Sequence, residues 1–402
     1  MKVHRRSFCQ GLGAGLLGAS LAPSRVRGQA EEVMPMLKET SEAVYVQGLP
    51  RGASAEQILQ AVRRTAEAAT DFSWLSRGDT VLLKPAANSK NPYPATTSPL
   101  AVAAMAKLLK EKGAGKVILC DKAGVAAVYQ TPDRVRGSTR QCFLNNGLHP
   151  AALDSGAEAL YFEETPYDSF FSDTPPVGSH WKNGIWMPGV IQQADHIVLL
   201  PRVSRHVLAG STLALKMAIG WLRDDSRLEL HRDAATFYQK IAEIHHLPSI
   251  QKRLRLTLTV ATQVLAAFGP DFGAVAEPDP GLVFASTSLV AHDLVSLSWL
   301  LWCREHAIPK SALGFARDPY QTFPGAMNRA FVGTIWGLSE MLHSQTFDPV
   351  RLRTVWDDPV LRRARGIENG APRLQLEPLD QSLPAQVQDQ LSGYLRRPEQ
   401  SA

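Results

Sequence analysis

The chain has 402 residues, of which 45% are hydrophobic, and its formal net charge is +5 at pH 7. This size is enough for one large core or two smaller ones, and no bias of composition indicates disorder. The positive charge alone would favour a nucleic-acid partner. However, the first thirty residues hold five basic and no acidic side chains, and 38 of the 43 basic residues then remain against 38 acidic ones. The charge therefore gives no support to nucleic-acid binding.

The first thirty residues have the three parts of an export signal in order. Arg5 and Arg6 precede a weakly apolar segment, 12–22, and Gly28-Gln29-Ala30 is a small-residue cleavage site. We expect a twin-arginine signal over 1–30, with the twin-arginine export machinery as a partner and a periplasmic location. The alternative is a basic, glycine-rich tail. The apolar segment is too short and too rich in glycine for a stable membrane span.

Strands alternate with capped helices in the next part of the chain. Residues 43–46 are a candidate first strand, and Ser54 opens a capping box before an apolar helical stripe. Ser98 and Pro99 predict the start of a second helix, which Gly113 ends. Further strands are expected over 80–83, 116–120, 197–200, 256–260 and 282–286. This order predicts an α/β domain, 31–303, with a mostly parallel sheet and helices on both faces.

The remaining segments are less regular. Residues 145–186 are aromatic and irregular, and we expect a packed excursion over the sheet, with a lid over a cleft as the alternative. Residues 282–302 fit a strand and a buried helix better than a membrane span. After Cys303 the chain becomes rich in proline and arginine, which predicts a helical C-terminal extension over 304–402.

Basic side chains gather where the strand at 197–200 ends. Pro201 stops that strand, Arg202 and His206 follow it, and Lys216 interrupts an apolar helix-like run. A lysine in such a run must extend to solvent, pair with an acid or face a cleft. Arg202 has the alternative of facing solvent or pairing with an acid.

These residues predict one site at the carboxyl edge of the sheet. Lys84 and His206 each follow a strand directly, and parallel strands end at the same edge, so Lys84, Asn88, His206 and Lys216 should surround one pocket. Converging cations and helix amino termini would bind a small anion such as a phosphate or carboxylate. We predict catalytic roles for Lys216 and His206, and ligand-binding roles for Lys84, Asn88, Thr97, Asp121 and Arg202.

Other chemistry has no diagnostic motif. G-x-S-x-G and the P-loop are absent, and no C-x-x-C occurs, although a disulfide among Cys120, Cys142 and Cys303 stays open. The histidines lack metal-ligand spacing, so we expect no metal site. The histidines considered were His206, His231, His245, His246 and His292.

Several motifs carry a family resemblance. They are L-K-P-A-A-N at 83–88, G-A-G-K-V-I-L-C-D at 113–121, A-D-H-I-V-L-L-P-R at 194–202 and S-T-L-A-L-K-M-A-I-G at 211–220. Together they resemble family 362 of the domains of unknown function, over about 78–300. The resemblance implies an α/β fold and sometimes an iron–sulfur partner module, but no settled reaction. Thr262 and Ser288 replace expected acidic residues, which argues against a carboxylate-held metal.

Two classes of function follow. One is an exported enzyme that depends on a cofactor or an anionic substrate, with redox chemistry included. The other is a non-catalytic periplasmic ligand-binding or accessory protein. The sequence names neither the cofactor nor the substrate.

Overall fold

The computed structural model describes residues 41–175, 178–206, 208–267, 269–271, 273–308, 354–368 and 373–396. The chain divides into two compact units, Met1–Met36 and Leu37–Ala402, and all described residues belong to the second. The expected export signal lies outside the described residues.

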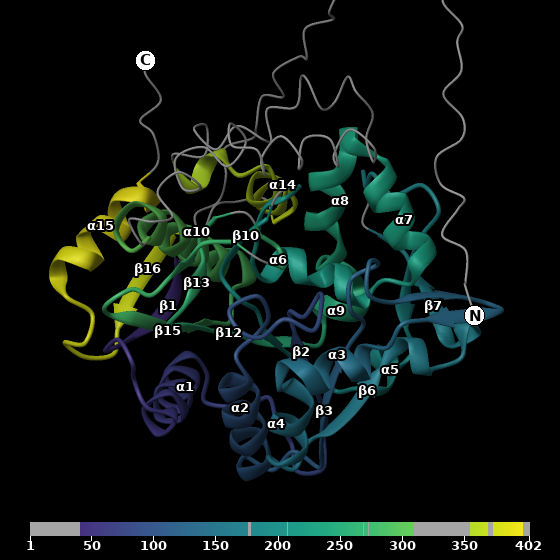
Figure 1. Ribbon diagram of the computed structural model, residues 1–402, viewed down its shortest axis with the longest axis horizontal. Coiled ribbons are helices and arrows are strands. Elements are labelled where there is room, and N and C mark those ends of the chain that lie inside the picture. Colours follow the sequence, from purple (N-terminus) through teal and green to yellow (C-terminus); the bar gives the residue numbers. More distant parts are fainter. Residues whose placement is uncertain are drawn as a thin grey trace, which may run out of the picture. The chain divides into compact units, whose positions relative to one another are not determined.

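An eight-stranded sheet forms the centre of the second unit (Figure 1). Its strands, in spatial order, are β16 (Arg373–Pro378), β1 (Ser41–Leu49), β15 (Gly281–Ser286), β12 (Leu254–Ala261), β9 (His196–Leu200), β2 (Thr80–Pro85), β3 (Lys116–Asp121) and β6 (Glu158–Tyr161). Only β15 runs against the other seven of this sheet. The predicted α/β class with a mostly parallel sheet is confirmed.

Helices cover both faces of this sheet. On one face lie α1 (Ala55–Ala69), α2 (Pro99–Glu111) and α4 (Leu148–Leu153), and on the other lie α8 (Phe237–Ile244) and α10 (Leu289–His306). Alternate residues of one strand enter the two cores, as the pleat of a strand requires: Val81 and Leu83 face α2, whereas Leu82 faces the α10 side. The central strands are therefore buried on both sides.

The helix starts agree closely with the sequence signals. Ser54 caps α1, because its hydroxyl accepts from the Gln57 N–H at 3.2 Å and the Gln57 side chain accepts from the Ser54 N–H at 2.8 Å. Pro99 stands in the first turn of α2, although the Ser98 side chain makes no capping bond. No helix of the described ranges is long and apolar enough to cross a membrane.

The stretch 145–186 is more regular than predicted. It contains the end of α3 (Thr139–Asn146), then α4 and the edge strand β6, and further on a hairpin of β7 (Phe170–Asp173) and β8 (Ile185–Pro188). The expected packing agrees with the core positions of Phe162 and Trp181, but the expected irregularity was wrong, because the stretch contains these helices and strands.

The C-terminal part contains the predicted helices and one strand that was not predicted. Helix α14 (Pro359–Ile367) packs on α8, and α15 (Ala385–Leu395) packs on α10. Between them β16 adds a parallel edge strand to β1, with Ser41 opposite Arg373. The extension therefore shares the central sheet and its core.

A small four-stranded sheet lies beyond the carboxyl end of β9. It consists of β11 (Gly210–Thr212), β10 (Ser204–His206), β13 (Val264–Leu265) and β14 (Val275–Ala276). The apolar run that follows forms only the short α6 (Ala214–Met217) and a 3-10 turn, η3 (Ala218–Trp221). The other elements are β4 (Tyr129–Thr131), β5 (Arg134–Arg136), α5 (Val190–Gln193), α7 (Asp224–Arg232), α9 (Pro248–Gln251), η1 (Phe162–Glu164), η2 (Tyr167–Ser169), η4 (Ala234–Thr236) and η7 (Val355–Asp357).

Candidate functional site

A cavity of about 150 Å³ lies at the carboxyl ends of β2 and β3, beside the small sheet. Lys84, Asn88, His206 and Lys216 all line it, as do Asp121 and Asp271. The structure thus brings together, from three separate segments, the four side chains that the sequence placed around one pocket. The roles given to them stay predictions. No described residue of 145–186 lines this cavity, so that stretch does not cover it as a lid.

Lys84 is bound firmly within the protein. Its ammonium lies 2.8 Å from the Asp121 carboxylate, and it donates to the carbonyls of Pro85 at 2.9 Å and Met217 at 3.2 Å. Burial lowers the pKa of Lys84 and raises the pKa of Asp121, and each charge partly offsets the shift of the other. Both side chains are at most 2% exposed. This pair holds the ends of β2 and β3 together.

Gly220 covers that ion pair closely. A Cβ at this position would lie 2.2 Å from Asp121 Oδ1 and 2.4 Å from Lys84 Nζ, which no side chain tolerates. Glycine is therefore required here by close approach, and it lets η3 pack directly on the pair.

A second buried pair lies beside the first and was missed by the sequence analysis. Lys122 lies 2.7 Å from Asp224, and burial lowers the pKa of Lys122 to about 8. Arg227 donates to the carbonyls of Lys122, Gly220 and Leu222 at 2.9, 3.0 and 3.0 Å. These bonds fix the loop after β3 to η3. No local pattern announces them, because Asp224 and Arg227 are about one hundred residues from Lys122.

His206 is held in one orientation by the backbone. Its Nδ1 accepts from the N–H groups of Leu208 at 3.1 Å and Ala209 at 3.2 Å. Nδ1 is therefore unprotonated and Nε2 carries the hydrogen. Burial, followed by the charges of Lys216 and Arg202, lowers the pKa of His206 well below its ordinary value. A neutral ring thus offers its Nε2–H to a ligand in the cavity.

Lys216 differs from Lys84 and Lys122 in having no bound partner. It is half-buried and lines the cavity, and within the described part of the chain no hydrogen bond or ion pair engages its ammonium. Burial and the charge of Arg202 lower the pKa of Lys216 to about 7, although Asp271 acts in the opposite direction. At neutral pH roughly half of these side chains are therefore uncharged amines.

Arg202 is buried without any partner. Only 1% of the Arg202 surface is exposed, and none of its three guanidinium nitrogens has a hydrogen-bond acceptor in the described ranges. Burial lowers the pKa of Arg202 to about 10, partly offset by the charge of Asp271. Arg202 lies close enough to Lys216 and His206 to lower the pKa of both. Arg202 is not among the residues that line the cavity, but its charge acts on two that do, His206 and Lys216.

Two buried hydroxyl groups belong to the small sheet beside the cavity. Ser204 Oγ and Thr212 Oγ1 are buried and have no partner among the described residues. Ser204 and Thr212 are opposite each other in β10 and β11, so their side chains share a face. His206 is two residues after Ser204 in β10, which puts their side chains on the same side of that strand. Hydrogen-bond donors of Ser204, His206 and Thr212 therefore belong to the small sheet, and the charges of Arg202 and Lys216 act on His206.

The remaining predicted residues have different positions. Asn88 lines the cavity, and its carbonyl accepts from the Gly124 N–H at 2.8 Å. Thr97 does not line it: its hydroxyl accepts from the Ala86 N–H at 2.8 Å and donates to the Leu200 carbonyl at 2.5 Å. Thr97 ties β2 to β9, so its hydroxyl is unavailable to a ligand. Arg205 is likewise engaged, because it donates to the Gly210 carbonyl.

The histidines do not form a metal centre in the described ranges, where no three His, Cys, Asp or Glu side chains converge on one point. His231 lines the cavity, and its Nδ1 lies 2.7 Å from the Arg227 carbonyl. His292 lies elsewhere, beside Asp293, whose carboxylate caps α6 through the N–H groups of Ala214 and Leu215. Cys120, Cys142 and Cys303 are free thiols.

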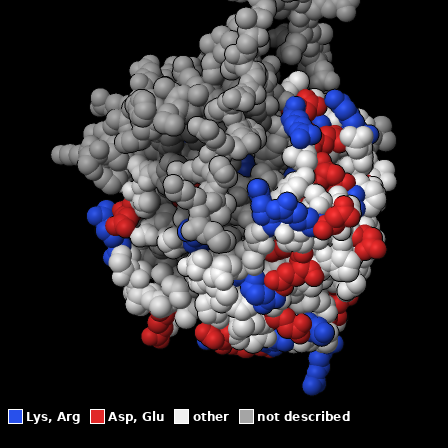
Figure 2. Space-filling view, turned by 45° about the vertical axis from the view of Figure 1, so that its right-hand side comes forward, with Lys and Arg blue, Asp and Glu red and all other residues white. Residues whose placement is uncertain are grey.

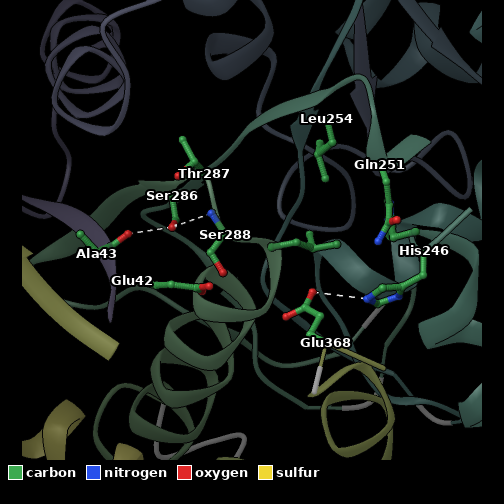
Figure 3. A pocket seen from close by; sticks show the side chains of 11 residues that line it. Glu42, Ala43, His246, Gln251, Leu254, Ser286, Thr287, Ser288 and Glu368 are labelled. Atoms are coloured by element: carbon green, nitrogen blue, oxygen red, sulfur yellow. Dashed lines mark hydrogen bonds and ion pairs between the residues drawn. The ribbon is translucent and has the colours of Figure 1, made fainter. Parts of the chain in front are cut away.

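A larger cavity, of about 540 Å³, lies at the opposite edge of the sheet, where β1 and β12 begin (Figure 3). Two pairs of its lining groups are bound to each other, whereas His245 Nδ1 is buried without a partner in the described ranges. Ser286 donates to the Ala43 carbonyl at 2.7 Å, and His246 lies 3.3 Å from Glu368. None of the predicted site residues lines it. We therefore place the candidate site in the smaller cavity, which Lys84, Asn88, Asp121, His206 and Lys216 line.

The described surface gives no sign of a nucleic-acid interface on the face seen in Figure 2. There, basic and acidic side chains are interspersed over the described residues rather than gathered by sign. This distribution agrees with the balanced charge of the chain beyond residue 30.

Residues 81–298 match the family described as Domain of unknown function (DUF362). This match covers more than half of the 402 residues, so the chain belongs to that family. The resemblance recognised from its motifs is thereby confirmed. The comparison with curated proteins finds no match.

Two solved structures share part of the arrangement. One is the lactate racemase apoprotein from Thermoanaerobacterium thermosaccharolyticum, with a TM-score of 0.35, 14% identity, and coverage of 55% of this chain and 50% of that one. The other is a Thermotoga maritima structural-genomics target, with a TM-score of 0.34, 11% identity, and coverage of 58% and 55%. The chain thus spans about half the length of each, and similarity at this level carries no argument about function.

Proposed function

We propose that the protein is an enzyme that binds a small organic anion in the cavity at the carboxyl ends of β2 and β3. The observation that carries this proposal is Arg202, a fully buried guanidinium without an acceptor. A buried charge without a partner costs several kcal/mol. A carboxylate or phosphate would supply the missing acceptors through charge-assisted hydrogen bonds.

The neighbouring residues suit the same ligand. Ser204 and Thr212 have hydroxyl groups free to donate to it, and His206 offers its Nε2–H as a neutral donor. The ion pair of Lys84 and Asp121 neutralises itself and keeps the cavity in shape. The excess positive charge therefore comes from Arg202 and Lys216.

The alternative function is ligand binding without catalysis. A binding protein needs donors and fixed charges, which Arg202 supplies. Lys216 favours an enzyme, because an unpaired amine with a pKa of about 7 can give or accept a proton at neutral pH. Incubation of a bound organic acid with the protein in D2O distinguishes the two: an enzyme of this kind exchanges a carbon-bound hydrogen or forms a product, whereas a binding protein returns the acid unchanged.

Titration calorimetry with propionate, inorganic phosphate and sulfate tests the anion site. We expect saturable binding of at least one of these anions to the wild type. Replacement of Arg202 by Met should weaken that binding by about tenfold or more, the scale of a lost hydrogen bond to a charged group. The matched control is Arg134→Met, which removes an exposed arginine on β5. Equal binding by all three proteins would contradict the proposal.

We further propose that the protein is exported by the twin-arginine route and acts in the periplasm. The support is the order of Arg5, Arg6, the apolar segment and the small-residue site at 28–30. This proposal rests on the sequence alone and is independent of the anion site.

A further inference from the structure

We infer that Lys216 is a carbonyl-reactive amine, and that the substrate is a small aldehyde or ketone that also carries a carboxylate or phosphate. This inference rests on the anion site proposed above and names the chemical class of its ligand. The anionic end would occupy the cluster of Arg202, Ser204 and Thr212, and the carbonyl carbon would meet Lys216.

The three lysines that line the cavity differ in whether a carboxylate binds them. Lys84 is paired with Asp121 at 2.8 Å, and Lys122 is paired with Asp224 at 2.7 Å. A carboxylate partner stabilises the ammonium form and engages its hydrogens, which disfavours attack of that nitrogen on a carbon atom. Among the described residues Lys216 has no such partner, so it is the lysine of this cavity whose lone pair can become available.

The charges around Lys216 and its burial favour the neutral amine. Arg202 places a positive charge near Lys216, and Asp271, whose charge acts in the opposite direction, accepts a hydrogen bond from Ser89 Oγ at 2.9 Å. Positive charge and burial both favour the neutral amine, which is how proteins activate lysine as a nucleophile. A solvent-exposed lysine at neutral pH is an amine in fewer than about one molecule in a thousand.

The cavity also supplies a hydrogen-bond donor for the carbonyl oxygen of such a substrate. As Lys216 Nζ bonds to the carbonyl carbon, an electron pair moves to the carbonyl oxygen, which then needs hydrogen-bond donors and a proton. His206 Nε2–H is fixed by its two backbone bonds at Nδ1 and lines the same cavity. It serves as a donor to that oxygen and not as a base.

The step balances without a further reactant. The Lys216 amine adds to the carbonyl carbon, and the proton lost from nitrogen compensates the one gained by oxygen, which gives a carbinolamine. The carbinolamine carbon–oxygen bond then breaks with the nitrogen lone pair forming the C=N bond, and the oxygen takes a proton from solvent and leaves as water, which gives a protonated imine. Nothing is oxidised or reduced. The positive nitrogen then withdraws electrons from bonds at the neighbouring carbon.

Reductive trapping tests this inference on the full chain. The protein is incubated with pyruvate or with dihydroxyacetone phosphate in the presence of sodium cyanoborohydride, and modified peptides are located by mass spectrometry. We expect a stoichiometric reduced adduct on Lys216 with one of the two compounds, which also identifies the anionic group. Propionate or inorganic phosphate, which have no carbonyl, should slow the labelling.

Two variants make the outcome decisive. Lys216→Met should bind the anion more weakly and give no adduct, whereas Lys252→Met, which removes an exposed lysine, should label as the wild type does. Thermal melting shows that each variant is folded. Anion binding by calorimetry without any adduct on Lys216, or an adduct spread evenly over surface lysines, would overturn this inference and leave the anion site standing. Absence of anion binding to the wild-type protein would overturn both.

Discussion

Lys84 and Asp121 form an ion pair of 2.8 Å at the floor of a cavity in which Lys216 has no bound partner among the described residues. The contrast separates two uses of a buried lysine. Lys84 is neutralised and also bound by two carbonyls, so it stabilises the ends of β2 and β3. Lys216 is available to a ligand, either as a charged ammonium or, when it loses its proton, as an amine with a lone pair.

Replacement of Gly220 tests whether the ion pair of Lys84 and Asp121 stabilises the fold. We expect Gly220→Ala to destabilise the protein by about 3–5 kcal/mol, because the new methyl group would force Lys84 and Asp121 apart and leave buried charges without partners. The measurement is the free energy of unfolding in urea. The control is Gly366→Ala in α14, where nothing lies within 4 Å of the added Cβ. That change should stabilise the helix by roughly 0.5–1 kcal/mol. Similar unfolding energies for the two variants would contradict the close approach at Gly220.

Replacement of Arg202 tests whether its buried charge serves ligand binding or the stability of the fold. In the absence of ligand, Arg202→Met should unfold at an equal or higher temperature than the wild type, because it removes a buried charge that has no partner. Adding an anion that binds should raise the melting temperature of the wild type by more than that of the variant. A variant that melts well below the wild type without ligand would show that Arg202 stabilises the fold instead.

The pKa of Lys216 gives a pH dependence whose sign is fixed. The folded pKa is about 7 and the unfolded value is about 10.4, so between these values the unfolded chain binds more protons than the folded one. The cost of burying Lys216 is thus fully present below pH 7 and disappears as the pH rises toward 10. We expect Lys216→Met to be more stable than the wild type at pH 6 and to lose about half or more of that advantage by pH 9. Denaturation at several pH values measures this difference, and a pH-independent difference would contradict it.

The affinity for an anion should also depend on the protonation of Lys216, and it should decrease as the pH rises. Binding to the wild type should weaken as the pH rises from 6 to 9, since Lys216 loses its charge while Arg202, with a pKa of about 10, keeps most of its own. His206 stays neutral across this range and contributes no step. Calorimetry on Lys216→Met should show little change over the same interval. An equally steep loss in that variant would assign the dependence to another group.

Export is tested independently of the site. Changing Arg5 and Arg6 together to Lys should leave the protein in the cytoplasm, because the twin-arginine signal requires the pair. Cell fractionation measures the distribution, and the matched control is Arg25→Lys, which keeps the pair. Normal amounts of the double variant in the periplasm would contradict the assignment.

The architecture was largely predictable from the sequence because its signals are local. Ser54 and Pro99 mark helix starts, and the buried strands between such helices imply a parallel sheet whose ends meet at one edge. The same reasoning placed Lys84, Asn88, His206 and Lys216 together. The strand β16 escaped prediction, because its alternation is only between exposed and half-buried residues and its partner β1 is over 300 residues away.

Pairing within the site was not predictable in the same way. The sequence shows that Lys84, Asp121 and Lys216 are charged, but only distances reveal that the first two neutralise each other. Asp224 and Arg227 come from a helix whose charges look like those of an ordinary exposed face. Thr97 was predicted to bind a ligand, yet its hydroxyl joins two strands. A motif identifies a neighbourhood, and the partner of each polar atom decides its role.

The most direct measurement of the central claim is a crystal structure of the protein soaked in iodide, whose anomalous signal locates bound anions. We predict an iodide ion in the cavity, in contact with the guanidinium of Arg202 and near Lys216 and His206, and its displacement by an organic anion that binds in solution. A cavity without iodide at concentrations that occupy other sites, with the Arg202 nitrogens bonded to protein acceptors, would contradict the account.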